Sequence, residues 1–338
     1  MKPGRRRFLA ASGALLVARH VRAQPAKRPR IGVLSPFPRP SPEQWARHEA
    51  TLALAELGWV EGKTIDFELA FAEGREDRLP ELAKGLVRRG VDLIWARTSE
   101  AAVAAARATQ TIPIVFTNVT LPVETGLVDS LSRPGRNATG VAFLAGDTSQ
   151  PVKAIEFLRQ LAPKVRRLGS LWSEHNFEKV SGGEYKGGYR LFEKSIRELG
   201  FELRVENVAV AADYDGAFAR LVAWRAEALL ALSTPINFRE MKRIIGFARQ
   251  HRLPSAHDSR AFAEAGGLLA YGPLPREIAA QSARHVDLVL RGAKPAELAV
   301  EMPHRIELTI NLTTASELGI VVPQPLLLRA DRLVGKPS

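Results

Sequence analysis

The chain has 338 residues, 46% of them hydrophobic and 25% charged, so it can form two domains with buried cores and is too apolar to be disordered. Its net charge is +12, but six basic residues lie in the first 23 positions without an acidic one, and no basic stripe interleaved with aromatic residues follows, so we expect no nucleic-acid partner. The absence of cysteine excludes disulfides, thiolate catalysis and cysteine-based zinc sites.

The N-terminus has the pattern of an export signal. The sequence RRRFL at residues 5–9 matches the twin-arginine motif, and the apolar stretch behind it is too short to span a membrane. Small residues at positions 21 and 23 predict cleavage after Ala23, giving a signal peptide of residues 1–23 and a periplasmic mature protein. An ordinary Sec signal or an uncleaved anchor is the alternative, and Arg19 behind the apolar core favours the twin-arginine route.

Apolar runs alternate with helical patterns along the rest of the chain, which predicts an α/β fold with parallel sheets. The predicted strands are residues 30–35, 64–70, 91–96, 112–116, 138–144, 168–172, 203–209, 227–232, 254–257, 268–271 and 305–311. The predicted helices are residues 42–57, 78–89, the alanine-rich segment after Ser99, 122–131, 151–161, a helix ending at Leu199, 214–224, 237–251, 276–291 and 313–318.

The strand–helix turn after Ala96 is the first candidate for a ligand site. Thr98 or Ser99 can cap the helix that follows, and Glu100 favours its positive end. In such units ligands bind beyond the carboxyl ends of the strands, where free helix amides and hydroxyl groups hold polar or anionic groups.

A similar unit recurs late in the chain, where Ser233 and Thr234 interrupt the strand at residues 227–232. Pro113 and Pro254 stand 141 positions apart, and the helix-ending ELG of residues 56–58 returns 142 positions later. These offsets indicate two similar lobes with a cleft between them. The alternative is the ordinary alternation of any α/β chain.

Motifs for catalysis and metal binding are missing from the sequence. There is no nucleophile elbow, no HExxH and no calcium loop, so we expect no metal and no cofactor. Glu174 and Asp258 could meet across a cleft as an acid–base pair, but a carboxylate there fits equally well as the partner of a ligand ammonium group.

Several motifs together resemble the ABC-transporter substrate-binding protein family related to tryptophan- and tyrosine-binding proteins. They include RIGVLS at residues 30–35, TIPIVF at 111–116, GLVDSLSRPGRNATGV at 126–141 and FAEAGGLLAYGP at 262–273. The resemblance implies a type I periplasmic-binding-protein fold: two Rossmann-like lobes with parallel sheets, joined by a three-strand hinge. It implies lobe 1 from residues 30–140 plus 272–300 and lobe 2 from residues 141–271 plus 301–327, with hinge residues Gly140, Tyr271 and Gly272.

The family's ligand contacts come from strand ends that face the cleft. Here these positions are Ser35, Phe37, Thr98, Ser99, Asn118, Thr120, Trp172, Ser173, Asn176, Ser233, Thr234 and Asp258. The chain departs from the family's pattern at Arg97, where a small glycine is usual, and at residues 120–122, 173–174 and 233–235. These departures lie in the implied pocket, so the ligand's identity does not carry over.

We therefore expect an exported solute-binding protein that delivers a small polar molecule to an ABC importer and acts as a monomer with a permease partner in the inner membrane. For an aromatic amino acid, Phe37 or Trp172 would stack on the ring, Thr98 and Ser99 would hold the carboxylate, and Asp258 the ammonium group. The alternatives are a ligand-sensing subunit of a membrane receptor and an envelope enzyme.

Overall fold

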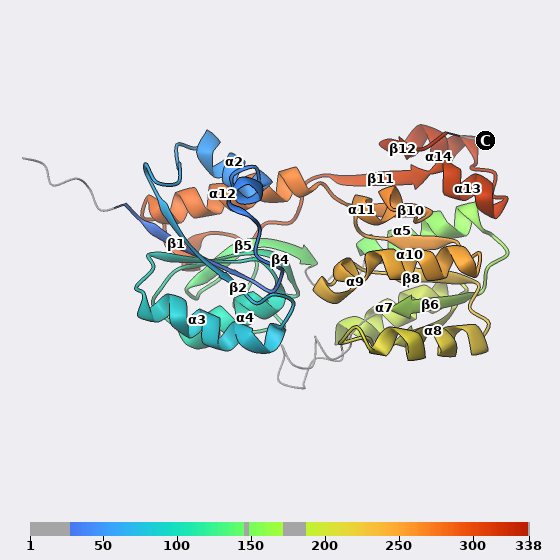
Figure 1. Ribbon diagram of the computed structural model, residues 1–338, viewed down its shortest axis with the longest axis horizontal. Coiled ribbons are helices and arrows are strands. Elements are labelled where there is room, and N and C mark those ends of the chain that lie inside the picture. Colours follow the sequence, from blue (N-terminus) through green and yellow to red (C-terminus); the bar gives the residue numbers. More distant parts are fainter. Residues whose placement is uncertain (1–27, 145–148, 172–186, 337–338) are drawn as a thin grey trace, which may run out of the picture.

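The computed structural model describes residues 28–144, 149–171 and 187–336, which form two α/β lobes side by side (Figure 1). The strands are β1 (Arg30–Ser35), β2 (Asp66–Phe71), β3 (Leu93–Ala96), β4 (Ile114–Thr120), β5 (Ala138–Leu144), β6 (Arg167–Leu171), β7 (Glu202–Glu206), β8 (Ala228–Ala231), β9 (Ser255–His257), β10 (Leu269–Pro273), β11 (Ile306–Asn311) and β12 (Arg332–Val334). The helices are α1 (Pro42–Ala46), α2 (Glu49–Glu56), α3 (Leu79–Arg88), α4 (Ser99–Ala108), α5 (Ser149–Leu161), α7 (Gly187–Glu198), α8 (Asp213–Ala223), α9 (Pro235–Arg239), α10 (Met241–Gln250), α11 (Arg260–Glu264), α12 (Pro275–Leu290), α13 (Leu312–Leu318) and α14 (Gln324–Arg329), with short 3-10 turns η1 (Glu76–Arg78) and η2 (Pro295–Glu297).

The first lobe is built on a parallel sheet with the strand order β2-β1-β3-β4-β5. Alternate residues of β3 face opposite sides, as Ile94 packs with α3 and α4 whereas Trp95 packs with α2 and α12. Helix α12 follows β10 in the chain but lies against α2 in this lobe (Figure 1). The first lobe therefore contains a late segment of the chain.

The second lobe is built on a sheet with the order β12-β11-β10-β9-β8-β6-β7. Its neighbours are parallel except for β10 and β11, which are antiparallel because β11 enters from the other lobe. Helices α5, α7, α13 and α14 bury apolar residues against one face, and α8 and α10 against the other. Both sheets are thus covered on two sides, which the near-continuous apolar strands require.

The chain passes between the lobes after β5, after β10 and before β11. Gly140 lies within β5, opposite Phe116 in the first-lobe sheet; it has a φ of 147°, and a Cβ placed there would lie 2.1 Å from the carbonyl oxygen of Phe116. In β10, shortly before the second passage, a Cβ on Gly272 would lie 1.7 Å from the carbonyl oxygen of Asp258. Glu301, before β11, donates its amide to the Gly140 carbonyl of β5 at 2.9 Å. Backbones approach closely here, so only glycine fits at both positions.

The predicted fold class is confirmed: the structure has two α/β lobes with largely parallel sheets. Three predicted helices were wrong in detail. The helix expected at 42–57 is two helices, because His48 is extended and caps α2, and the one expected at 237–251 is α9 and α10 with a break at Glu240. The helix expected at 122–131 is a series of turns, since Gly126 has a φ of 71°.

In the described part of the chain, no helix has the length and apolar character that a membrane span requires.

Candidate functional site

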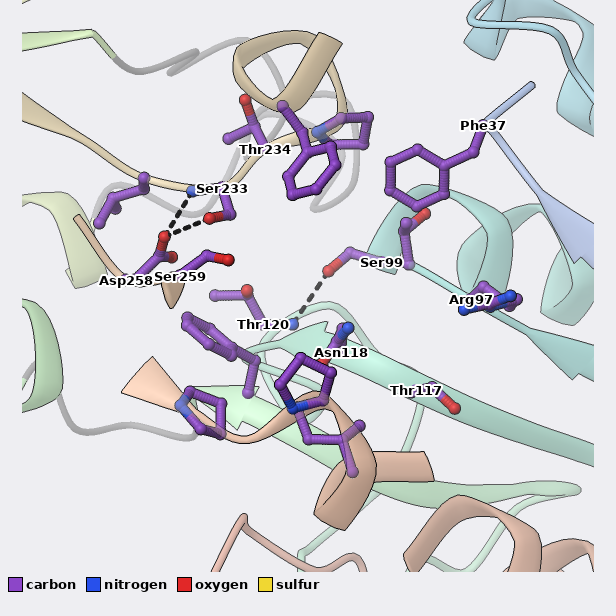
Figure 2. Close-up of a pocket in the computed structure, with 18 of the residues that line it drawn as sticks. Phe37, Arg97, Ser99, Thr117, Asn118, Thr120, Ser233, Thr234, Asp258 and Ser259 are labelled. Atoms are coloured by element: carbon purple, nitrogen blue, oxygen red, sulfur yellow. Dashed lines mark hydrogen bonds between the residues drawn. The ribbon is translucent and has the colours of Figure 1, made fainter. Parts of the chain in front are cut away.

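A cavity of about 480 Å³ lies between the lobes, where the carboxyl ends of the strands of both sheets meet (Figure 2). That volume suits a small organic molecule. Eight residues predicted to bind ligand line it: Phe37, Thr98, Ser99, Asn118, Thr120, Ser233, Thr234 and Asp258. Trp172, Ser173 and Asn176, also predicted, lie outside the described residues, as does Glu174 of the alternative acid–base pair.

On the first-lobe side, the start of α4 and the end of β4 are joined by a hydrogen bond. Thr120 donates its amide to the Ser99 hydroxyl at 2.9 Å (Figure 2). Between Thr117 and Val119 the pairing of β4 with β5 shifts register, and Asn118 takes a left-handed conformation with a φ of 58°. Asparagine tolerates that conformation better than most residues, and the irregularity directs its exposed side chain toward the cavity.

The first turn of α4 satisfies several of its own polar groups. The Thr98 hydroxyl accepts the Ala101 amide at 3.3 Å, as an N-cap residue does. The Glu100 carboxylate accepts the Thr98 hydroxyl and the Glu100 backbone amide, and burial raises the pKa of Glu100 against the effect of these bonds. The helix start that the sequence marks as an anion site therefore already holds a carboxyl group of its own.

On the second-lobe side, Asp258 is a buried carboxylate at the end of β9. It accepts hydrogen bonds from the Ser233 amide at 2.7 Å and from the Ser233 hydroxyl at 2.5 Å (Figure 2). Burial raises the pKa of Asp258 to about 6, and the bonds from Ser233 oppose that rise. Among the described residues no cationic side chain pairs with it. Thr234 caps α9 by accepting the Asn237 amide at 3.2 Å.

Apolar side chains from both lobes complete the walls of the cavity. Phe37 of the first lobe meets Phe238 of the second edge to face, with ring centroids 6.5 Å apart. Phe143, Phe192 and Ile278 add further apolar surface. Sequence reasoning missed Phe238, which lies one residue beyond the predicted start of its helix.

Ser35 is the predicted site residue that the structure places behind the cavity wall. It is fully buried at the end of β1, and its hydroxyl accepts the Phe37 amide at 3.3 Å. It does not line the cavity, but the hydrogen bond fixes the turn that presents Phe37.

Arg97 and His48 also line the cavity and were not predicted as site residues. Arg97 follows β3, is partly buried and lies with its Nη2 3.1 Å from the His48 Nε2. Burial lowers the pKa of Arg97 to about 10, and burial together with the Arg97 charge lowers the pKa of His48 to about 4. The sequence marked Arg97 as a departure from the family pattern. It gave no signal for His48, which lies within the single helix predicted at residues 42–57.

Within the described ranges, no three histidine, cysteine or acidic side chains are grouped as a metal ion would require. His257 of β9 is fully buried and bonded to the Ser255 hydroxyl and the Ala231 carbonyl. Burial lowers the pKa of His257 to about 4, so it is neutral at pH 7. Its contacts are those of a structural histidine.

Two lobes joined by three passages of the chain, with a cavity of this size between them, define a two-lobed binding protein of the type I periplasmic-binding-protein fold. Within that class, the chain belongs to the ABC transporter substrate binding protein family, whose sequence model matches residues 31–334. Family and fold are those of solute-binding proteins rather than of enzymes.

A curated relative, the tyrosine-binding protein of Clostridioides difficile (strain R20291), is 31% identical over 177 residues, which is half of this chain and half of the relative. A conserved domain protein from Vibrio cholerae is similar in structure, with a TM-score of 0.80 and 27% identity over 91% of this chain and all of that one. The ABC domain from Streptococcus pneumoniae in complex with L-Trp has a TM-score of 0.81 and 23% identity over the same shares.

Proposed function

We propose that the protein is an exported, periplasmic solute-binding protein that captures an amino acid, with an aromatic side chain favoured, and delivers it as a monomer to the permease of an ABC importer. One observation carries the proposal: Asp258, a buried carboxylate that no cationic side chain of the described residues pairs with, faces a cavity whose walls include Phe37 and Phe238. The names of the tyrosine-binding relative and of the L-Trp complex agree with such a ligand.

In this proposal the ligand's ammonium group pairs with Asp258, because a desolvated carboxylate gains most from a charged donor. The ring lies against Phe37 and Phe238, and the ligand's other polar atoms meet the first-lobe wall at Ser99, Asn118 and Thr120. Micromolar binding corresponds to about −8 kcal/mol, which one buried ring and a few charge-assisted hydrogen bonds can supply.

Thermal unfolding of the mature chain tests this proposal. The chain from Gln24 onward is unfolded with amino acids, sugars, nucleosides or small carboxylates in excess. We expect an aromatic amino acid to raise the stability of the protein, by about 2.7 kcal/mol at a hundredfold excess over Kd. Stabilisation by sugars or nucleosides alone would contradict the proposed ligand class. Asp258→Asn should remove the stabilisation by amino acids, because it removes the charge that pairs with the ammonium group.

A sensing role for a membrane receptor would use the same fold and cavity. Uptake of the labelled ligand by cells that lack the protein separates the two roles. Uptake is lost if the protein is a subunit of the importer and is retained if it only senses the ligand.

A further inference from the structure

Arg97 brings a positive charge to the cavity, and no carboxylate of the described residues pairs with it. It continues the side of β3 on which Trp95 packs against α2 and α12, and its guanidinium contacts His48. Among the described residues no acidic side chain lies within ion-pair distance of Arg97, although Glu49 and Glu100 line the same cavity. With a pKa near 10 it stays protonated at neutral pH. A partly desolvated cation without a counter-charge is costly for a folded protein.

The His48 ring faces two hydrogen-bond donors but can accept from only one of them. The His48 Nδ1 lies 3.1 Å from the Ala50 amide, a donor, and its Nε2 lies 3.1 Å from the Arg97 Nη2, another donor. A neutral imidazole has only one acceptor nitrogen. In either tautomer, one of the two contacts therefore sets two N–H groups face to face. An oxygen anion beside Arg97 would supply the missing acceptor.

The hydroxyl groups at the start of α4, which could otherwise bind an anion, already form hydrogen bonds within the protein. The Thr98 hydroxyl bonds to the Ala101 amide and to Glu100, whose carboxylate covers the start of α4. The Ser99 hydroxyl accepts the Thr120 amide. A ligand carboxylate at that helix start would displace these bonds and meet the Glu100 carboxyl group.

We infer that Arg97, with His48 beside it, holds the carboxylate of the ligand, so that the ligand is a carboxylic acid fixed by a cation of the first lobe. Asp258 lies across the cavity from Arg97, in the other lobe (Figure 2). An amino acid would then join the lobes through its two charges. The planar guanidinium can bind a carboxylate through two parallel hydrogen bonds. The inference rests on the proposed function and replaces the Thr98 and Ser99 hydroxyls as the carboxylate site.

Three probes separate the two charges of the ligand in calorimetric titrations. L-tyrosine has both groups, tyramine lacks the carboxylate, and 3-(4-hydroxyphenyl)propionate lacks the ammonium group. We expect Arg97→Gln to weaken binding of the two carboxylates by about 30-fold or more and to leave tyramine within about twofold. Arg97→Lys should retain part of the affinity because it keeps the charge. Arg107→Gln, an exposed arginine of α4, is the matched control and should change nothing.

A second readout needs no ligand. If Arg97 is held for a ligand anion, Arg97→Met should raise the Tm of the empty protein by about 1–3 °C, because it removes an unbalanced charge. If Arg97 instead stabilises the fold, the same change lowers the Tm. Arg107→Met again serves as the control.

The inference is overturned if tyramine binds the wild-type protein as tightly as L-tyrosine, if Arg97→Gln leaves the affinity for L-tyrosine unchanged, or if Arg97→Met lowers the Tm of the empty protein. If none of the three probes binds, the aromatic ligand of the proposed function fails. The Tm of the empty Arg97→Met variant then decides the inference by itself.

Discussion

At the scale of single residues, the raised pKa of Asp258 makes the stability of the folded protein depend on pH. Its pKa is about 6 in the folded protein against an ordinary value of 3.8, so the folded state binds the proton more tightly than the unfolded state. The stability of the empty protein should therefore fall as pH rises from about 4 to 6, by up to about 3 kcal/mol. Denaturant unfolding of the wild-type protein and Asp258→Asn across this range measures the effect. A constant stability difference between the two would contradict it.

Ionisation of Asp258 lowers the stability of the empty protein but should strengthen ligand binding. An ammonium group needs the ionised form of Asp258, so affinity for an amino acid should fall about tenfold between pH 7 and pH 5. Glu100, whose pKa burial also raises, is another carboxyl group of the cavity wall. Asp258→Asn distinguishes the two, because any pH dependence left in that variant belongs to another group.

At the scale of elements, the close approach of β4 and β5 makes Gly140 a structural position. A Cβ there would meet the Phe116 carbonyl, whereas one on Gly58, with a φ of 91°, would meet nothing within 4 Å. We expect Gly58→Ala to lower the free energy of unfolding by about 1 kcal/mol and Gly140→Ala by about 3 kcal/mol or more. Chemical denaturation compares them, and equal losses would show that the approach at Gly140 relaxes without cost.

Local sequence signals predicted the elements that position the site. The apolar run of β3 and the two hydroxyl residues after it placed the start of α4, and of the two candidate caps, Thr98 and Ser99, Thr98 is the cap. Breaks that depend on backbone angles were missed, since nothing in the periodicity of residues 42–57 shows that His48 is extended. The Arg97–His48 contact joins residues far apart in the chain, so it could be seen only in the folded structure.

At the scale of the whole molecule, α9 of the second lobe contacts the first lobe near the cavity. Phe238 meets Phe37, and the Arg239 guanidinium donates to the Gly74 carbonyl at 3.3 Å. Both contacts come from α9, which the Thr234 cap holds in place. We expect Phe238→Ala with Arg239→Ala to open the empty protein and to weaken ligand binding about tenfold, because closure then has fewer interlobe contacts.

Small-angle X-ray scattering tests this expectation through the radius of gyration, which should be larger for the double variant than for the wild type. Arg249→Ala, an exposed arginine of α10 that pairs with Glu317 within the second lobe, is the control. An unchanged radius of gyration with unchanged affinity would show that these contacts do not hold the lobes together.

Equilibrium dialysis with radiolabelled L-tyrosine, followed by chromatography of the recovered label, tests the central claim most directly. The claim is that the interlobe cavity captures an amino acid and releases it without chemical change. The predicted result is one labelled molecule bound per chain at micromolar concentration, recovered as L-tyrosine and displaced by unlabelled L-tyrosine. Absence of binding at millimolar ligand, or recovery of the label as a different compound, would contradict it.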